Sequence, residues 1–157
     1  MNQNLATAKM ISMPVRWIYL ATAFFLVLTG FGQMPIFKRY YIADIPGLGW
    51  LAEFFVTHYI HYLGAIVFLA LAAFMIADYL ISKRNSRHVT ASGYVRIALL
   101  TGILSSGALL VIRNLTETNF APEFIIFLDL IHLGLVMVFL FVSLYCLILK
   151  KHWTTER

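Results

Sequence analysis

Three histidines of this sequence lie inside long apolar stretches, where a side chain that can ionise is unusual. They are His58, His61 and His132, whereas His88 and His152 fall in short polar segments. An ionisable group inside such a stretch is costly to bury, and its presence therefore raises a question of function. Because neutral imidazole is a common axial ligand of haem iron, the first chemistry that these residues suggest is metal coordination.

Two of the histidines lie at similar distances from an acidic residue that marks the start of an apolar stretch. His61 follows Glu53 by eight residues, and His132 follows Glu123 by nine. At 1.5 Å per residue, each imidazole lies about 12–14 Å below its acidic marker if both stretches are helical. Both helices would cross the membrane in the same direction, so the imidazoles would lie at matched depth in the outer half of the bilayer. Since bundles build cofactor sites between facing helices, the spacing predicts one haem held by His61 and His132.

Four further residues are candidates for supporting roles around these ligands. Gly64 follows His61 by three residues and shares its helix face, where a missing side chain would let a flat macrocycle approach. His58 precedes His61 by three residues, and Asp129 precedes the second predicted ligand by the same interval. His58 and Asp129 would bond each other, or His58 would bind one haem propionate while Arg113 binds the other.

The same residues also allow plainer interpretations. A histidine inside a membrane more often joins two helices by a hydrogen bond than binds a metal, and His58 with Asp129 would form such a pair. Small residues such as Gly64 also occur at ordinary contacts between membrane helices. The spacing of His58 and His61 is found in zinc sites, although no cysteine or carboxylate completes a tetrahedron. Whether His58 rather than His61 is a haem ligand stays open.

The composition predicts the elements that position these residues. Of the 157 residues, 61% are hydrophobic and 12% are charged, and the mean hydropathy is +0.83. A soluble domain carries about 25% charged residues, so the polar surface is too small for a protein that faces water. A membrane helix needs about 20 apolar residues, and four apolar stretches run approximately over residues 15–34, 50–81, 95–112 and 124–149. We expect an all-α fold, an integral membrane four-helix bundle in contact with lipid, forming a single membrane domain over residues 1–157.

Two stretches depart from the ideal length of a membrane helix. The second is long and is expected to tilt or to begin above the membrane, while the third is short. Proline and glycine separate the stretches, and Pro122 lies where the first turn of a helix tolerates proline. The first stretch is longer than the apolar core of a signal peptide and has no clear cleavage site. We therefore expect it to be retained as a membrane helix.

Basic residues indicate the orientation, since cytoplasmic segments carry an excess of lysine and arginine. Nine lie at the N-terminus, in the second connection or at the C-terminus, namely Lys9, Arg16, Lys83, Arg84, Arg87, Arg96, Lys150, Lys151 and Arg157. On the other face lie Lys38, Arg39 and Arg113, together with acidic residues that include Glu117. Both termini are therefore predicted to be cytoplasmic. The basic residues follow the ends of apolar runs rather than a stripe, so no nucleic-acid partner is expected.

Several segments give the sequence a resemblance to a known family. They are residues 58–68 and Ile131-His132, together with Arg16-Trp17 and residues 24–30 of the first stretch. In these segments the chain resembles the membrane cytochrome b subunits of respiratory formate dehydrogenases and periplasmic nickel–iron hydrogenases, which are prokaryotic cytochrome b561-like proteins. The resemblance covers most of the chain. It implies a multi-pass subunit of the bacterial inner (cytoplasmic) membrane that carries electrons between an outer-facing, iron–sulfur partner and the quinone pool and anchors that partner.

The family typically holds two haems b, and the resemblance implies that this chain keeps one of them. His61 and His132 match the family's ligands of the outer haem. Where the family has the ligands of the inner haem, this sequence has Arg16 and approximately Cys146, and neither is an expected axial ligand. The loss of both together implies a single-haem variant, and it puts in doubt the family's quinone site beside the inner haem.

Two classes of function follow from these observations. With one haem b and no open coordination position, the chain would transfer electrons as a subunit of an oxidoreductase complex rather than act as a complete enzyme. Residues 35–49 and 114–123 would dock the outer redox partner, and a quinone would be the other exchange partner. The alternative is a haem-free membrane anchor or assembly subunit whose histidines only join helices. A small transporter is less expected, because the sequence has no broken helix pair or internal repeat.

Overall fold

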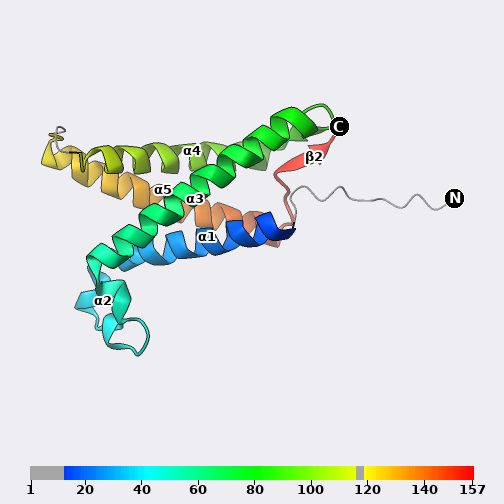
Figure 1. Cartoon of the computed structure of the whole chain (residues 1–157). Helices are drawn as coiled ribbons and strands as arrows, with labels where there is room; N and C mark the ends of the chain where they lie inside the picture. Colours follow the sequence, from blue (N-terminus) through cyan, green and yellow to red (C-terminus); the bar gives the residue numbers. More distant parts are fainter. Residues whose placement is uncertain (1–12, 116–118) are drawn as a thin grey trace. The chain divides into compact units, whose positions relative to one another are not determined.

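Helices dominate the computed structural model, which describes residues 13–115 and 119–157 (Figure 1). Four of them are long and apolar enough to cross a membrane: α1 (Met13–Gly32), α3 (Phe54–Asp78), α4 (Ala91–Ile112) and α5 (Pro122–Ile148). A π-helix, η3 (Tyr79–Lys83), continues α3. The prediction of a mostly helical chain with four membrane-length helices is confirmed for the described residues. Lys9 and Glu117, which entered the prediction of orientation, lie outside them.

The ends of the helices refine the predicted stretches. The long second stretch begins with a separate 3-10 turn, η2 (Gly49–Ala52), before α3 starts at Phe54. The third stretch was predicted to be short, but α4 starts earlier, at Ala91, and has 22 residues. The helix starts there because the Thr90 side chain caps it by accepting a hydrogen bond from the Gly93 N–H. The fourth begins with Pro122 in the first turn of α5, as predicted.

The chain packs as two compact units, one that ends at Asp78 and one that begins at Tyr79. In the first unit α1 packs against α3, and in the second α4 packs against α5. Each pair is formed by successive long helices of the chain. Within its own unit, a residue of α3 or α5 therefore finds its neighbours mainly on the preceding long helix.

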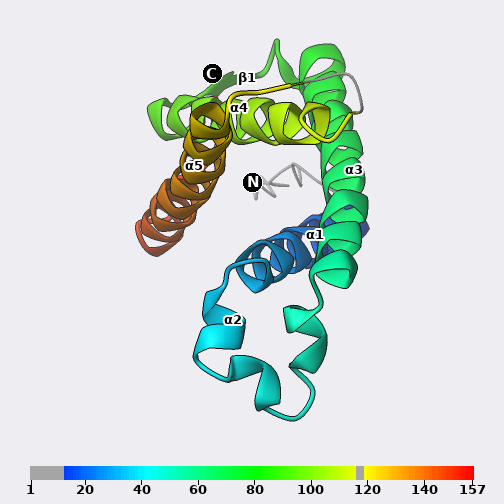
Figure 2. The ribbon, with the colours of Figure 1, turned by 90° about the vertical axis from the view of Figure 1, so that its left-hand side faces the viewer.

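In the first unit a small lobe connects α1 to α3 (Figure 2). It consists of α2 (Ile36–Arg39), η1 (Ile42–Asp44) and η2. Leu51 of η2 is almost completely buried, and a methyl group added to Gly32 would lie 3.1 Å from its side chain. The close approach that this glycine allows attaches the lobe to the end of α1.

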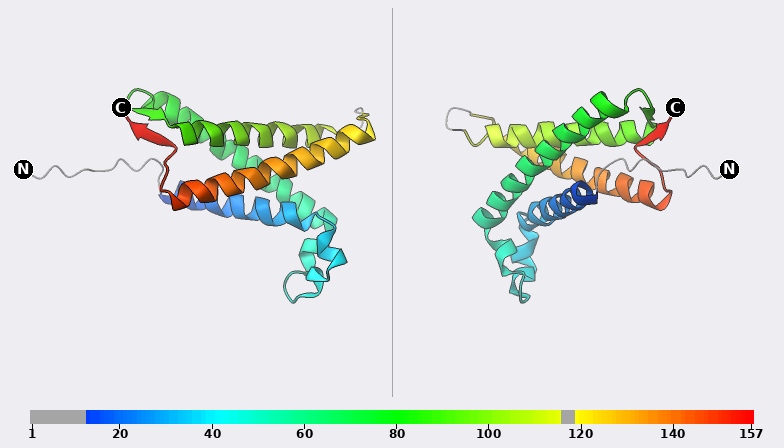
Figure 3. Two further views of the ribbon diagram at one scale, coloured as in Figure 1. Left: turned by 180° about the vertical axis from the view of Figure 1, so that it is seen from behind. Right: turned by 45° about the vertical axis from the view of Figure 1, so that its right-hand side comes forward.

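In the second unit the C-terminal tail is attached to the start of α4 (Figure 3). Two strands that the sequence analysis did not predict, β1 (Arg87–Val89) and β2 (Thr154–Glu156), pair antiparallel. The buried guanidinium of Arg96 donates to the Lys151 carbonyl over 3.3 Å and lies 4.2 Å from the centre of the Trp153 ring. Gly93 belongs to the same contact, because any side chain there would collide with the Trp153 carbonyl.

Large apolar side chains cover the outside of both units. Phe55 is 84% exposed and Leu147 is 74% exposed, while few apolar side chains of the described residues are fully buried. A soluble monomer rarely presents extended apolar surface to water. The surface therefore fits helices that are surrounded by membrane lipid.

Candidate functional site

His61 lies in the first third of α3, about 10 Å along the helix from its start, with its ring against α1. Its Nδ1 is 3.0 Å from the hydroxyl oxygen of Thr29, whose side chain is completely buried. The next residue, Gly30, lies under the ring, and a methyl group added there would lie 3.4 Å from the imidazole Cε1. Helix α1 thus supplies both a hydrogen-bond partner for this imidazole and, at Gly30, the space that the ring occupies.

His132 has the same kind of environment in the second unit. It lies about 15 Å along α5 from the start of that helix, and its Nδ1 is 2.9 Å from the hydroxyl oxygen of Ser106 in α4. Ser106 is buried, and the residue that follows it is again a glycine. A methyl group added to Gly107 would lie 3.3 Å from the imidazole Cε1. The two histidines that the sequence singles out as haem ligands therefore have closely matching neighbours.

This environment has a definite chemical consequence for metal binding. The hydroxyl engages Nδ1 in both units, so coordination of a metal by His61 or His132 would use Nε2. Histidine ligands of metals almost always hydrogen-bond through the ring nitrogen that does not bind the metal. The donors present are imidazoles with an oriented ring, which fit the axial positions of a haem iron.

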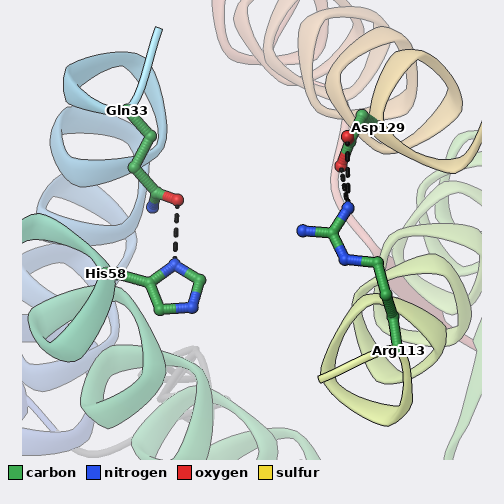
Figure 4. Close-up of polar contacts among 4 residues, drawn as sticks. All are labelled: Gln33, His58, Arg113 and Asp129. Carbon is green, nitrogen blue, oxygen red and sulfur yellow. Dashed lines mark hydrogen bonds and ion pairs between the residues drawn. The ribbon is translucent and has the colours of Figure 1, made fainter. Parts of the chain in front are cut away.

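The ring of His58 packs among different neighbours, one turn before His61. Its Nδ1 is 3.1 Å from the side-chain oxygen of Gln33 in α1, and Figure 4 shows this amide pointing at the imidazole. The ring also lies between two aromatic residues of its own helix, with centroid distances of 5.2 Å to Phe54 and 4.3 Å to Tyr62. These contacts give His58 a packing role within the first unit.

Asp129 occupies the corresponding position, one turn before His132, and pairs with Arg113. The guanidinium of Arg113 donates to both carboxylate oxygens over 3.4 and 3.3 Å (Figure 4). Gln33 and Arg113 are thus partners of His58 and Asp129 within their own units. The bond between His58 and Asp129 that the sequence analysis considered stays a prediction. The predicted contacts of His58 and Arg113 with haem propionates stay predictions.

Gly64 provides a close contact between the two helices of the first unit. A methyl group added there would lie 3.1 Å from the Leu26 side chain of α1. The interpretation as a small residue at a helix contact therefore has direct support, while the predicted packing of Gly64 against a haem stays a prediction.

Of the two residues in place of the family's inner ligands, Arg16 is exposed and Cys146 is buried.

Four neighbours of the histidines escaped the sequence analysis: Thr29 and Gly30 in α1, and Ser106 and Gly107 in α4. The signal available was a hydroxyl residue followed directly by glycine inside an apolar stretch. The sequence also contains Ser92-Gly93 and Thr101-Gly102, whose glycines lie against Trp153 and Leu135 instead. The dipeptide alone therefore does not identify a histidine partner.

Within residues 13–115 and 119–157, no group of three His, Cys, Asp or Glu side chains is placed to hold a metal ion. The zinc interpretation of His58 and His61 thus finds no third ligand in that part of the chain. No family model, curated protein or solved structure matches the sequence. The function is therefore argued from the two histidine environments, and the resemblance to cytochrome b subunits stays a prediction.

Proposed function

We propose that this chain is the membrane cytochrome b subunit of an oxidoreductase complex, with His61 and His132 as the two axial ligands of one haem b. The observation that supports this proposal is the repeated environment of the two imidazoles. In each helix pair a buried hydroxyl engages Nδ1 and a glycine lies under the ring. A single contact of this kind would be an ordinary link between helices, but two with the same ring nitrogen engaged suggest one shared requirement.

The residues present fit a haem that only transfers electrons. When bound, a haem with two histidine ligands supplies one-electron chemistry and has no open position for a substrate. The role of His61 and His132 is then to hold the iron, while Thr29 and Ser106 orient their rings.

The orientation and the partners belong to the same proposal. The proposed location is a bacterial inner membrane, with both termini on its cytoplasmic side. The lobe between α1 and α3 and the connection before α5 then face outward. Both histidines then lie in the outer halves of their helices. The lobe carries exposed basic and aromatic side chains, Lys38, Arg39, Tyr40 and Tyr41. Such a surface suits an outer-facing redox protein, which the family resemblance suggests is an iron–sulfur subunit. A quinone is the proposed exchange partner on the other side of the transfer.

A second candidate function is a haem-free membrane anchor. The observation that favours it is that both histidines already join two helices through hydrogen bonds. In that case the hydroxyl contacts would serve only to fix each helix pair.

One spectroscopic experiment separates these functions. The full chain, expressed with haem supply and purified in lipid nanodiscs, should show the reduced-minus-oxidised spectrum of a b-type cytochrome. His61→Ala and His132→Ala should each abolish this spectrum, because each removes an axial ligand. His152→Ala is the control, since His152 is exposed in the C-terminal tail and its loss should leave the spectrum unchanged.

Two outcomes would contradict the proposal. A colourless but stably folded wild-type chain would favour the anchor. Loss of the haem in His58→Ala, with haem retained in His61→Ala, would show that the ligand on α3 is assigned to the wrong histidine. Circular dichroism of each variant separates loss of haem from loss of fold, since a bound cofactor also stabilises the native state.

A further inference from the structure

The direction of the hydrogen bond between Thr29 and His61 follows from a third group. The Thr29 hydroxyl lies 2.6 Å from the carbonyl oxygen of Phe25, one turn earlier in α1. A carbonyl oxygen only accepts hydrogen bonds, and a hydroxyl has a single proton to donate. The Thr29 proton therefore goes to Phe25, so the Thr29 oxygen accepts the bond from His61, and Nδ1 must carry a hydrogen.

The same reasoning applies to Ser106 and His132. The Ser106 hydroxyl donates to the carbonyl oxygen of Ile103 over 3.1 Å, while its oxygen lies 2.9 Å from the imidazole Nδ1. Ser106 is almost completely buried, so its one proton is directed by protein groups. The Nδ1 of His132 is again the donor.

We infer that Thr29 and Ser106 are a matched pair of positioning residues, which hold His61 and His132 in the Nδ1–H tautomer before any haem binds. In this tautomer the lone pair of the neutral ring is on Nε2, the nitrogen that a metal would use. The consequence at iron rests on the proposed function, whereas the tautomer itself does not depend on it.

Gly30 and Gly107 complete the positioning. A methyl group at either place would come within 3.4 and 3.3 Å of the respective imidazole Cε1, so a larger side chain would push the ring away from its hydroxyl partner. The hydroxyl fixes which nitrogen carries hydrogen, and the glycine fixes where the ring lies.

The hydroxyl bonds would also influence a bound haem. A hydrogen bond accepted from Nδ1–H raises the basicity of an imidazole ligand. A more basic ligand favours ferric over ferrous iron. Loss of either hydroxyl should therefore raise the midpoint potential of the haem.

The first test needs no haem. Ring nitrogens that carry hydrogen differ strongly in ¹⁵N chemical shift from those that do not, so the tautomer can be read in the full chain labelled with ¹⁵N-histidine and prepared without haem in nanodiscs. The signals of His61 and His132 are assigned by their loss in His61→Asn and His132→Asn. We expect hydrogen on Nδ1 in both residues, and hydrogen on Nε2 in either residue would overturn the inference for it.

The second test uses the haem-loaded chain. Thr29→Val and Ser106→Ala should each raise the midpoint potential and weaken haem binding by about 10- to 100-fold, the usual cost of losing a group that orients a metal ligand. Thr29→Ser and Ser106→Thr should restore wild-type values, because they return the accepting oxygen.

Matched controls exist for both substitutions. Thr57→Val removes a threonine that is equally buried and also donates to backbone carbonyls one turn earlier, those of Glu53 and Phe54. Ser105→Ala removes the exposed serine beside Ser106. Both should leave potential and affinity unchanged. Equal effects of test and control variants would overturn the inference. A wild-type chain that binds no haem would instead refute the proposed function, while the tautomer measurement would still decide the inference.

Discussion

The two helix pairs hold a histidine in the same way and differ in what lies one turn away. The distance from hydroxyl oxygen to Nδ1 is 3.0 Å in the α1–α3 pair and 2.9 Å in the α4–α5 pair. One turn before each histidine, the first pair joins Gln33 to His58, and the second joins Arg113 to Asp129. The shared hydroxyl contact indicates a common requirement of the two imidazoles. The different residues one turn away indicate that each helix pair is packed locally in its own way.

The pairs also differ in how their ends are connected. The first carries a lobe between its helices, anchored by Leu51 against Gly32. The second has a shorter connection between its helices, and at the opposite end its strands β1 and β2 bind the tail to the start of α4. The two histidines thus have the same kind of environment although their helix pairs are connected differently.

Filling the glycine positions should have the largest effect on this comparison. Gly30→Leu and Gly107→Leu should each displace the imidazole that lies above the glycine, and haem binding should fall by at least about 10-fold, the range for a disturbed metal ligand. Titration of the haem-free chain with haem, followed by absorbance, measures the loss.

Gly134→Leu is the control for this prediction, because nothing lies within 4 Å of a methyl group added there. Leucine favours helix more than glycine does, so weaker binding in the test variants would not come from a weaker helix. If only one of Gly30 and Gly107 matters, the two environments are not equivalent.

The pairs one turn away should give a smaller, unequal effect on stability. Arg113→Ala leaves the Asp129 carboxylate without its partner and should cost about 1 kcal/mol, the upper end for an exposed ion pair. Gln33→Ala removes a neutral bond to His58 and should cost about 0.5 kcal/mol, the lower end for such a bond. Thermal unfolding in nanodiscs compares the two.

Adding Asp129→Asn to Arg113→Ala should recover most of the loss, since the unpaired charge is then gone. An equal cost of Arg113→Ala and Gln33→Ala would mean that charge does not distinguish the two pairs.

The smallest expected effect is that of His58→Ala on the haem. The haem should be retained with an unchanged number of ligands, because His58 packs between Phe54 and Tyr62 and is not a proposed ligand. A modest shift in midpoint potential should follow from the changed surroundings of His61. Redox titration measures this shift, and electron paramagnetic resonance of the ferric state checks that two histidines still bind the iron.

Much of the fold followed from the sequence because a membrane helix requires a run of apolar residues. The four stretches were recognised, and Pro122 correctly indicated the start of α5. The strands β1 and β2 were missed, since each is only three residues long and forms by pairing with a distant partner. The fold of the lobe was missed for the same reason, because it depends on the approach of Leu51 to Gly32.

The sequence indicated which histidines deserved attention but not their neighbours. Thr29 and His61 are 32 residues apart, whereas Ser106 and His132 are 26 residues apart. Because the connections differ in length, no common spacing links hydroxyl and imidazole, and the repeated arrangement is invisible as a sequence repeat. Similarly, helical spacing placed His58 and Asp129 at equivalent positions but did not reveal that Gln33 and Arg113 are their partners.

The attachment of the tail limits how the second helix pair can move. Its two helices are joined through a loop at one end and through β1, β2 and the contact of Arg96 with Trp153 at the other. A piston-like slide of α5 along α4 would have to break the strand pairing and pull Trp153 off the guanidinium. The tail therefore resists a change in the position of α5 along α4, while the strand pairing lasts.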